Sequence, residues 1–178
     1  RLRLLSIISH DIRPELAEVT HDWIYDPQMW DLWMDGAPEL PTSDLSKYVE
    51  TEKRGREVVV FIGRASRIKG FPEFVNHARG NTNGRLYVVA GKVAAEDKKL
   101  VPELREMGSI VEDRFVSDEE ILSLYKVADY AWCRYAADYD QASGIFGRAW
   151  QTGVKPIVRD GSFLDSQLAD LGSSCSYF

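Results

Sequence analysis

The sequence has few of the residues that build disulfide frameworks or metal sites. Two cysteines, Cys133 and Cys175, and three histidines occur in 178 residues. The cysteines have neither metal-ligand spacing nor a paired framework, and His10, His21 and His77 share no spacing that suits a metal. We therefore expect no metal site. Because disulfides persist mainly in oxidising compartments, we also expect a reducing, cytoplasmic setting.

Positive charge and long apolar runs are also scarce. Lys and Arg number 22 against 28 Asp and Glu, so the formal net charge is -6. This balance argues against bulk binding to nucleic acid or to an anionic membrane. No run approaches the roughly 20 apolar residues that a membrane-spanning helix needs, and no signal-like leader opens the chain. We expect no transmembrane segment, and a local cationic pocket becomes the more informative feature.

From residue 58 onward, short β-rich runs alternate with amphipathic helical stretches, which is typical of a parallel sheet. We predict a Rossmann-like, doubly wound α/β fold with about six parallel strands. The expected strands are Glu57 to Ile62, Arg85 to Ala90, Ser109 to Glu112, Tyr130 to Arg134, Lys155 to Val158 and Ser174 to Phe178. The expected helices are Phe71 to Ala78, Asp97 to Met107, Asp118 to Val127, Gly144 to Thr152 and Phe163 to Leu171.

Residues 1–57 have a different pattern. A short apolar strand at Leu4 to Ile8 precedes a Trp-rich stretch and a polar, Pro-containing segment from Asp35 to Ser43. We interpret residues 1–57 as a linker or the remnant of an N-terminal domain, and residues 58–178 as the Rossmann-like domain. The chain begins at Arg1 rather than Met, so we expect it to be part of a longer protein.

The exit of the first predicted strand suggests a phosphate site. Gly63-Arg64 follows the apolar run, and Lys69-Gly70 follows it closely. An arginine guanidinium can donate two parallel hydrogen bonds to phosphate oxygens, and a lysine ammonium attracts them as a point charge. The N-terminus of the next helix offers unpaired backbone N–H groups to the same anion. Taken alone, the pattern also fits solvated residues on an ordinary loop.

Other strand exits carry residues of the same kind. Ligands of open parallel sheets bind outside the carboxyl ends of the strands. There we find Gly91, then Phe115-Val116-Ser117, and then a glycine-containing loop that leads into a helix. That loop contains Asp140, Ser143, Gly144, Ile145, Phe146, Gly147 and Arg148, and its helix N-terminus is suited to a diphosphate.

Together these segments resemble the nucleotide-sugar-binding C-terminal domain of retaining GT-B glycosyltransferases of group 1, which include glycogen synthase-like and mannosyltransferase-like enzymes. The resemblance covers Val58 to Phe178. It implies that Arg64 and Lys69 hold a donor diphosphate, and that Phe115 to Ser117 line the nucleobase. It also implies that the backbone amides of Gly144 to Gly147 contact the diphosphate.

The match is imperfect at the two acidic positions that the family uses for the donor sugar and the ribose. Asp140 stands at the first position and keeps the charge. Arg148 stands at the second and has only donors, so it cannot accept hydrogen bonds from ribose hydroxyls. Either the ribose is recognised by other groups or the donor differs, and Arg148 itself is either structural or faces phosphate.

The resemblance implies sugar transfer from a nucleoside diphosphate sugar with retention, with Arg64 and Lys69 stabilising the leaving diphosphate and Asp140 orienting the sugar. No divalent cation or other cofactor is expected. The acceptor site belongs to the N-terminal GT-B domain, so this chain alone should bind donor but transfer poorly.

Three alternatives to a transferase remain open. The chain could instead be a GT-B-type nucleotide-binding module that has lost transfer, a GT-B sugar-nucleotide epimerase, or an unrelated doubly wound protein such as a receiver-like domain. A receiver needs an acidic cluster after a strand, whereas the strand exits here are cationic.

Overall fold

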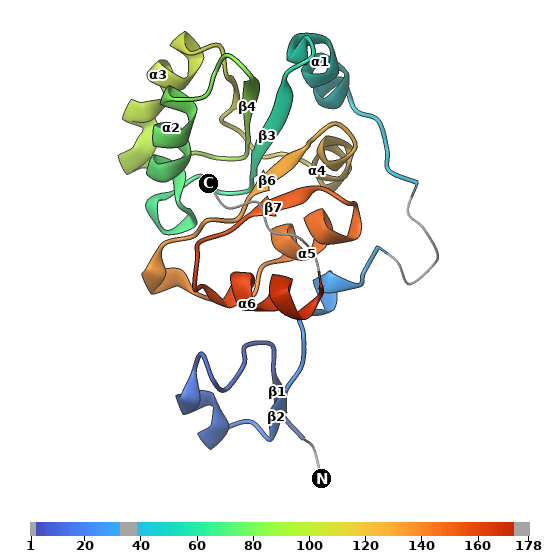
Figure 1. The fold of residues 1–178 in the computed structure, drawn as a ribbon, viewed down its shortest axis with the longest axis vertical. Coiled ribbons are helices and arrows are strands. Elements are labelled where there is room, and N and C mark those ends of the chain that lie inside the picture. Colours follow the sequence, from blue (N-terminus) through green and yellow to red (C-terminus); the bar gives the residue numbers. More distant parts are fainter. Residues whose placement is uncertain (1–2, 33–38, 173–178) are drawn as a thin grey trace.

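The computed structural model describes residues 3–32 and 39–172. A parallel sheet with strand order β5-β4-β3-β6-β7 forms its centre (Figure 1). The strands are β3 (Glu57–Ile62), β4 (Arg85–Ala90), β5 (Ile110–Glu112), β6 (Tyr130–Trp132) and β7 (Lys155–Ile157). The predicted α/β parallel sheet and these five strands are confirmed. The expected strand from Ser174 to Phe178 lies outside the described residues.

The strand order separates two kinds of doubly wound fold. Counted from β3, the order is 3-2-1-4-5, with the first strand in the middle of the sheet. This is the order of a Rossmann half, whereas the receiver-like order is 2-1-3-4-5. The receiver-like alternative is therefore wrong.

Helices cover both faces of the sheet, which explains the unbroken apolar run of β3. Val59 and Phe61 point into a cluster with α2 (Phe71–Arg79) and α3 (Val101–Glu106). Alternate residues of the same strand face a second cluster with α1 (Asp44–Lys53), α4 (Asp118–Tyr125) and α5 (Gly144–Gln151). A strand buried on both faces has no polar side to show.

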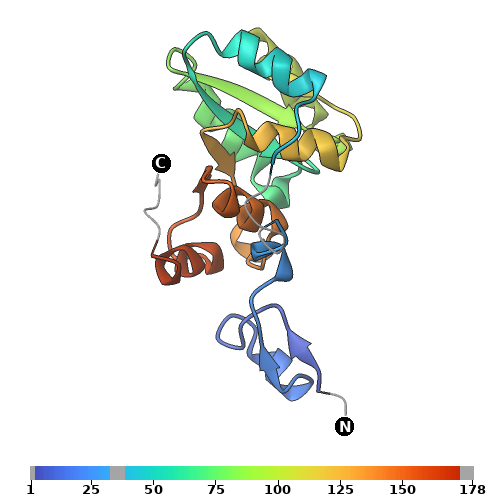
Figure 2. The same cartoon turned by 90° about the vertical axis from the view of Figure 1, so that its right-hand side faces the viewer.

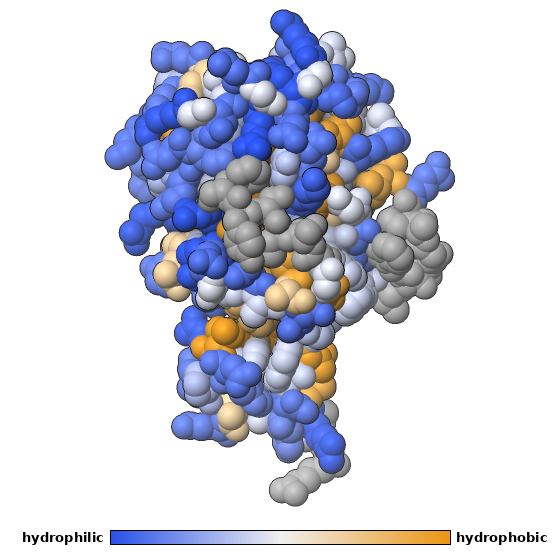
Figure 3. Space-filling model, in the orientation of Figure 1, coloured by the Kyte–Doolittle hydropathy of each residue, from blue (hydrophilic) through white to orange (hydrophobic). Residues whose placement is uncertain are grey.

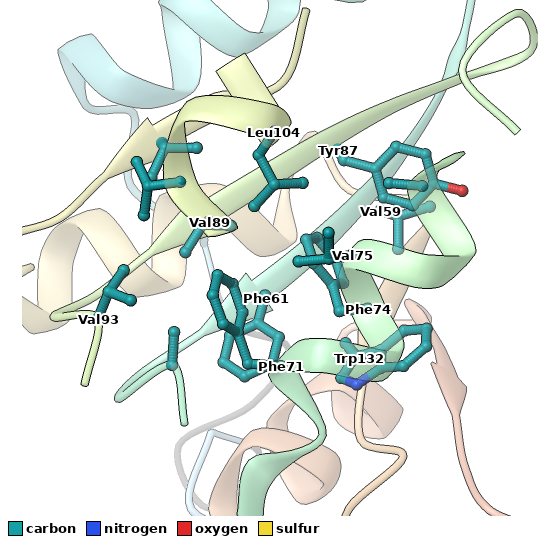
Figure 4. Close-up of a cluster of buried hydrophobic side chains, with 14 of the residues drawn as sticks. Val59, Phe61, Phe71, Phe74, Val75, Tyr87, Val89, Val93, Leu104 and Trp132 are labelled. Carbon is teal, nitrogen blue, oxygen red and sulfur yellow. The ribbon is translucent and has the colours of Figure 1, made fainter. Parts of the chain in front are cut away.

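Aromatic rings fill the first of these clusters. Phe61 lies 5.4 Å, centroid to centroid, from both Phe71 and Phe74, and Trp132 of β6 lies 5.4 Å from Phe74 (Figure 4). These edge-on contacts fix the start of α2 against the carboxyl end of the sheet. The loop before α2, which carries the predicted phosphate motif, is thereby anchored.

Helix boundaries follow local chemistry. The Ser117–Glu120 capping box before α4 is confirmed, with the Glu120 amide donating to Ser117 Oγ. The single helix expected from Asp97 to Met107 is wrong in detail, because the chain forms the 3-10 helix η4 (Ala95–Leu100) and then α3. Pro102 stands in the first turn of α3, where its missing N–H costs no hydrogen bond.

Helix α1 lies in the segment interpreted above as a linker. Ser43 caps this helix. Its Oγ accepts a hydrogen bond from the Ser46 amide, and the Ser46 Oγ accepts one from the Ser43 amide. Leu45 and Val49 are buried against the sheet. Ser at the third helical position in place of Glu makes this capping box harder to find in a sequence.

Residues 3–25 form a small lobe at one end of the molecule, as Figures 1 and 2 both show. Strand β1 (Leu5–Ser6) pairs in parallel with β2 (Asp22–Trp23), and the 3-10 helix η1 (Pro14–Glu18) connects them. Apolar side chains remain on its surface (Figure 3), among them Leu4, Leu5, Ile7, Val19 and Ile24. The 3-10 helix η2 (Pro27–Met29) then leads the chain onto α5.

A third cluster joins η2 and α5 to α6 (Phe163–Asp170), with Met29, Phe146 and Leu168 among its buried members. Within residues 3–32 and 39–172, no helix is both long and apolar enough to cross a membrane.

Candidate functional site

The loops after β3 and β4 touch through two glycines at the carboxyl edge of the sheet. A Cβ built on Gly91 would lie 1.9 Å from the carbonyl oxygen of Gly63, and the φ of Gly91 is +144°. Only glycine fits such an approach. Just beyond it the chains pair again, with Ala65 donating to Lys92 O at 3.0 Å and Ala94 donating to Ala65 O at 2.8 Å. The predicted pair Gly63 and Gly91 therefore forms one rigid edge.

Arg64 projects from this edge. Its side chain is exposed and has no hydrogen-bond or ion-pair partner among the described residues. It lines an open hollow of about 560 Å³, together with Ser66, Arg67, Glu96, Asp97 and Lys99. An unpaired guanidinium next to an open hollow is available to an anion.

Lys69 lies at the end of the same loop, in the 3-10 helix η3 (Arg67–Lys69), but its surroundings differ. Gly70 fits closely against the next part of the site, since a Cβ there would lie 2.0 Å from Arg134 O. The Lys69 ammonium stands over two tyrosine rings, 4.2 Å from the centroid of Tyr135 and 4.4 Å from that of Tyr139. Neither tyrosine was among the predicted site residues.

The loop after β5 presents an aromatic side chain. Phe115 is 85% exposed, whereas Val116 is buried. The Ser117 side chain is used in capping α4. Arg114 forms ion pairs with Glu112 and Glu120, and its hydrogen bonds hold the pKa of Glu120 at about 2. Phe115 is thus the member of the predicted segment with a side chain open to a ligand.

The N-terminus of α5 offers part of what was predicted. Ser143 caps the helix by accepting from the Phe146 amide, and its carbonyl accepts from the Gly147 amide. The amides of Gly144 and Ile145 have no partner among the described residues. The Phe146 side chain is fully buried, so it packs rather than binds.

The glycines of α5 have a different neighbour from the one predicted. A Cβ on Gly144 would lie 1.7 Å from Gln28 Oε1, and one on Gly147 would lie 2.5 Å from Gln28 O. The two glycines lie on one helical face because they are three residues apart. They leave room for η2, and this packing is their role in the structure.

Arg148 is committed to an ion pair. Its Nε and Nη2 donate to Asp31 Oδ2 at 3.0 and 2.8 Å. Gln151, one turn later, donates to Asp31 Oδ1 and to Gln28 O. These contacts hold residues 28–32 on α5. They give Arg148 a structural role, which uses two of the five N–H donors of its guanidinium, and contact of the remaining donors with a nucleotide stays a prediction.

Asp140 is committed as well. Its Oδ1 accepts from the Phe163 amide at 3.0 Å, and its Oδ2 pairs with Arg159 at 3.2 Å. It therefore caps the start of α6 and ties it to the loop after β6. This arrangement argues against the role predicted for Asp140 as a ligand of the donor sugar.

Metal-binding chemistry has little support in the described part of the chain, where no group of three or more His, Cys, Asp or Glu is placed to hold an ion. Cys133 is a buried free thiol. Burial raises its pKa to about 12, so it stays neutral.

Comparison with known proteins gives structural matches only. No family model matches the sequence, and no curated protein matches it significantly. WaaG, a glycosyltransferase involved in lipopolysaccharide biosynthesis, superposes with a TM-score of 0.64 at 14% identity, over 98% of this chain and 49% of that one. The chain has the fold of a GT-B C-terminal domain.

Other GT-B structures agree. The C-terminal domain of LpcC, a group 1 glycosyl transferase of Francisella tularensis, matches with a TM-score of 0.50 at 18% identity, over 70% of this chain and 69% of that one. An E. coli trehalose-6-phosphate structure bound with UDP-2-fluoro glucose matches with a TM-score of 0.54 at 7% identity, over 74% of this chain and 35% of that one. The chain spans about a third of that structure and about half of WaaG.

Proposed function

We propose that this GT-B domain is the donor-binding half of a retaining glycosyltransferase, which transfers a sugar from a nucleoside diphosphate sugar without a required metal. The acceptor is bound by an N-terminal GT-B domain in the longer protein, and the protein is cytoplasmic. The observation that carries the proposal is an unpaired Arg64 at the glycine-built carboxyl edge of a GT-B sheet.

Three kinds of group would contact the donor nucleotide: cationic side chains, backbone amides and an aromatic ring. The Arg64 guanidinium and the Lys69 ammonium neutralise the diphosphate, and the free amides of Gly144 and Ile145 add hydrogen bonds at a helix N-terminus. Phe115 stacks on the base. As the bond between sugar and phosphate breaks, charge grows on the leaving diphosphate, and cations fixed beforehand stabilise that state more than the ground state.

The proposed donor site is smaller than the sequence predicts, because Asp140 and Arg148 hold the scaffold together instead. The same observation favours a second candidate, a GT-B-type binding module that no longer transfers sugar. Without a carboxylate at the sugar, binding of the diphosphate is retained and orientation of the sugar is lost. The epimerase alternative has no separate observation in its favour.

The test is a thermal-shift panel of UDP, GDP, ADP and the sugar nucleotides UDP-glucose and GDP-mannose on the wild-type chain. We expect one nucleoside diphosphate to raise the midpoint, and Arg64→Ala to reduce that shift. Lys47→Ala, an exposed lysine on α1, is the matched control. A panel with no response, or an Arg64→Ala response equal to that of the wild type, contradicts the proposal. A product assay on the longer protein separates the transferase from the binding module.

A further inference from the structure

The Lys69 ammonium lies in a corner formed by aromatic rings, and no carboxylate of residues 3–32 or 39–172 forms an ion pair with it. The centroids of Tyr135 and Tyr139 are 5.9 Å apart, with an angle of 72° between the ring planes. The rings are therefore two walls that meet at an angle, and the ammonium lies 4.2 and 4.4 Å from their centres. Lys69 as a whole is half-buried, so the rings do not enclose it completely.

Among the acidic groups close to the two tyrosines in the chain, Asp140 is paired elsewhere and Cys133 is neutral, while the exposed Asp138 forms no ion pair with Lys69 in the described part of the chain. Asp140, next to Tyr139 in the chain, is paired with Arg159. Cys133, two residues before Tyr135, is held neutral by burial, which raises its pKa to about 12. Burial likewise raises the pKa of Tyr135 well above its usual value, so this ring stays neutral too. The faces of neutral aromatic rings attract a cation without cancelling its charge.

The corner is built into the fold at two further points. The Ala136 amide donates to Ile68 O at 3.1 Å, which ties η3 to the 3-10 helix η5 (Ala137–Tyr139). The Tyr135 hydroxyl lies 2.7 Å from Ser143 Oγ, the cap of α5. One tyrosine therefore touches both the ammonium and the helix N-terminus.

We propose that Tyr135 and Tyr139 are positioning residues for Lys69, which hold its charge unpaired and in fixed relation to the first turn of α5, ready for the diphosphate of a nucleotide. This inference rests on the proposed donor site. It assigns a role to two residues that no motif in the sequence marks, and it predicts that nucleotide affinity depends on the aromatic character of position 139.

The first experiment measures UDP affinity, or that of the nucleoside diphosphate the panel identifies, by calorimetry. Tyr139→Leu removes one ring face and should weaken binding about fivefold to tenfold, whereas Tyr139→Phe keeps the ring and should stay within about twofold of the wild type. Tyr48→Leu, at a tyrosine that is 54% exposed on α1, is the matched control and should change nothing. Equal weakening by Leu and Phe at position 139 would overturn the proposal.

The second experiment asks whether Tyr139 acts through Lys69. In a double-mutant cycle, Tyr139→Leu should cost affinity in the wild type but little in the Lys69→Ala background. The same loss in both backgrounds would mean that Tyr139 acts on the ligand or the fold directly, which contradicts a positioning role.

A third measurement separates this inference from the donor site. The methylene protons next to Nζ of Lys69 should show ring-current shifts by NMR in the ligand-free chain, and Tyr139→Leu should reduce them. Ordinary shifts in the wild type would refute the aromatic corner even if nucleotides bind. Displaced shifts with no nucleotide binding would refute the donor site, and with it the role given to the tyrosines, while the corner itself stands.

Discussion

The exits of β3 and β5 and the start of α5 all carry residues that were predicted to contact a ligand, yet the structure gives their side chains different surroundings. The side chains of Arg64 and Phe115 are exposed, and that of Arg64 has no polar partner within the described ranges. Arg148 and Asp140 are held by Asp31 and Arg159. The two groups differ in whether another segment brings an opposite charge to the side chain, and we expect only the unpaired group to bind ligand. Mutations at both regions can test this division.

The largest effect is expected for Gly91→Ala. The new Cβ would meet the Gly63 carbonyl, and the backbone at +144° disfavours any side chain. We expect a loss of about 2–4 kcal/mol in the free energy of unfolding, measured by urea denaturation. Gly80→Ala, where a Cβ has no neighbour within 4 Å, is the control. Gly144→Ala meets only the end of the Gln28 side chain, so it should cost less than Gly91→Ala, and a larger cost there would reverse the comparison.

Arg148→Ala and Arg64→Ala give the most direct comparison between a paired arginine and an exposed one. Arg148→Ala leaves a partly buried Asp31 without its main partner and should lower stability by about 2 kcal/mol. Arg64→Ala should keep stability within about 0.5 kcal/mol and weaken nucleotide binding instead. Urea denaturation and calorimetry on both variants decide the matter. The distinction between a binding arginine and a structural arginine is wrong if Arg64→Ala lowers the free energy of unfolding more than Arg148→Ala does.

The variant Phe115→Ala tests whether this side chain contacts the base of the nucleotide rather than its phosphates. Loss of one stacking ring should weaken binding of the nucleoside diphosphate by about 1–2 kcal/mol. Binding of inorganic pyrophosphate, which has no base, should stay unchanged in calorimetry. If pyrophosphate weakens equally, Phe115 does not stack on a base.

The smallest effect concerns pH. The pKa of Glu120 is lowered to about 2 by Arg114, so the ion pair stabilises the fold fully above the ordinary glutamate pKa of about 4.3. That contribution is lost as pH falls from there through about 2. Because the pair is exposed, the change should stay below about 1 kcal/mol. Glu120→Gln should flatten this part of the stability curve; an unchanged curve would show that Glu120 is not its source.

Much of the fold could be predicted because β3 and β4 have unbroken apolar runs and α4 begins with a capping box. The loop motif at Gly63 and Gly91 was predictable for a similar reason, since glycine is required where backbones meet. The pairing of Arg148 with Asp31 could not be found in the same way. It joins residues 117 positions apart, and nothing local in either segment specifies the contact. The tyrosines around Lys69 were missed because a cation–aromatic contact leaves no fixed spacing.

The joint between Gly63 and Gly91 also bears on how such a chain can change over generations. It is made of backbone alone, so it depends on glycine and on nothing that surrounds it. The exposed side chains of Arg64 and Phe115 are not part of it. A lineage can therefore exchange these exposed side chains while the architecture beneath is inherited unaltered.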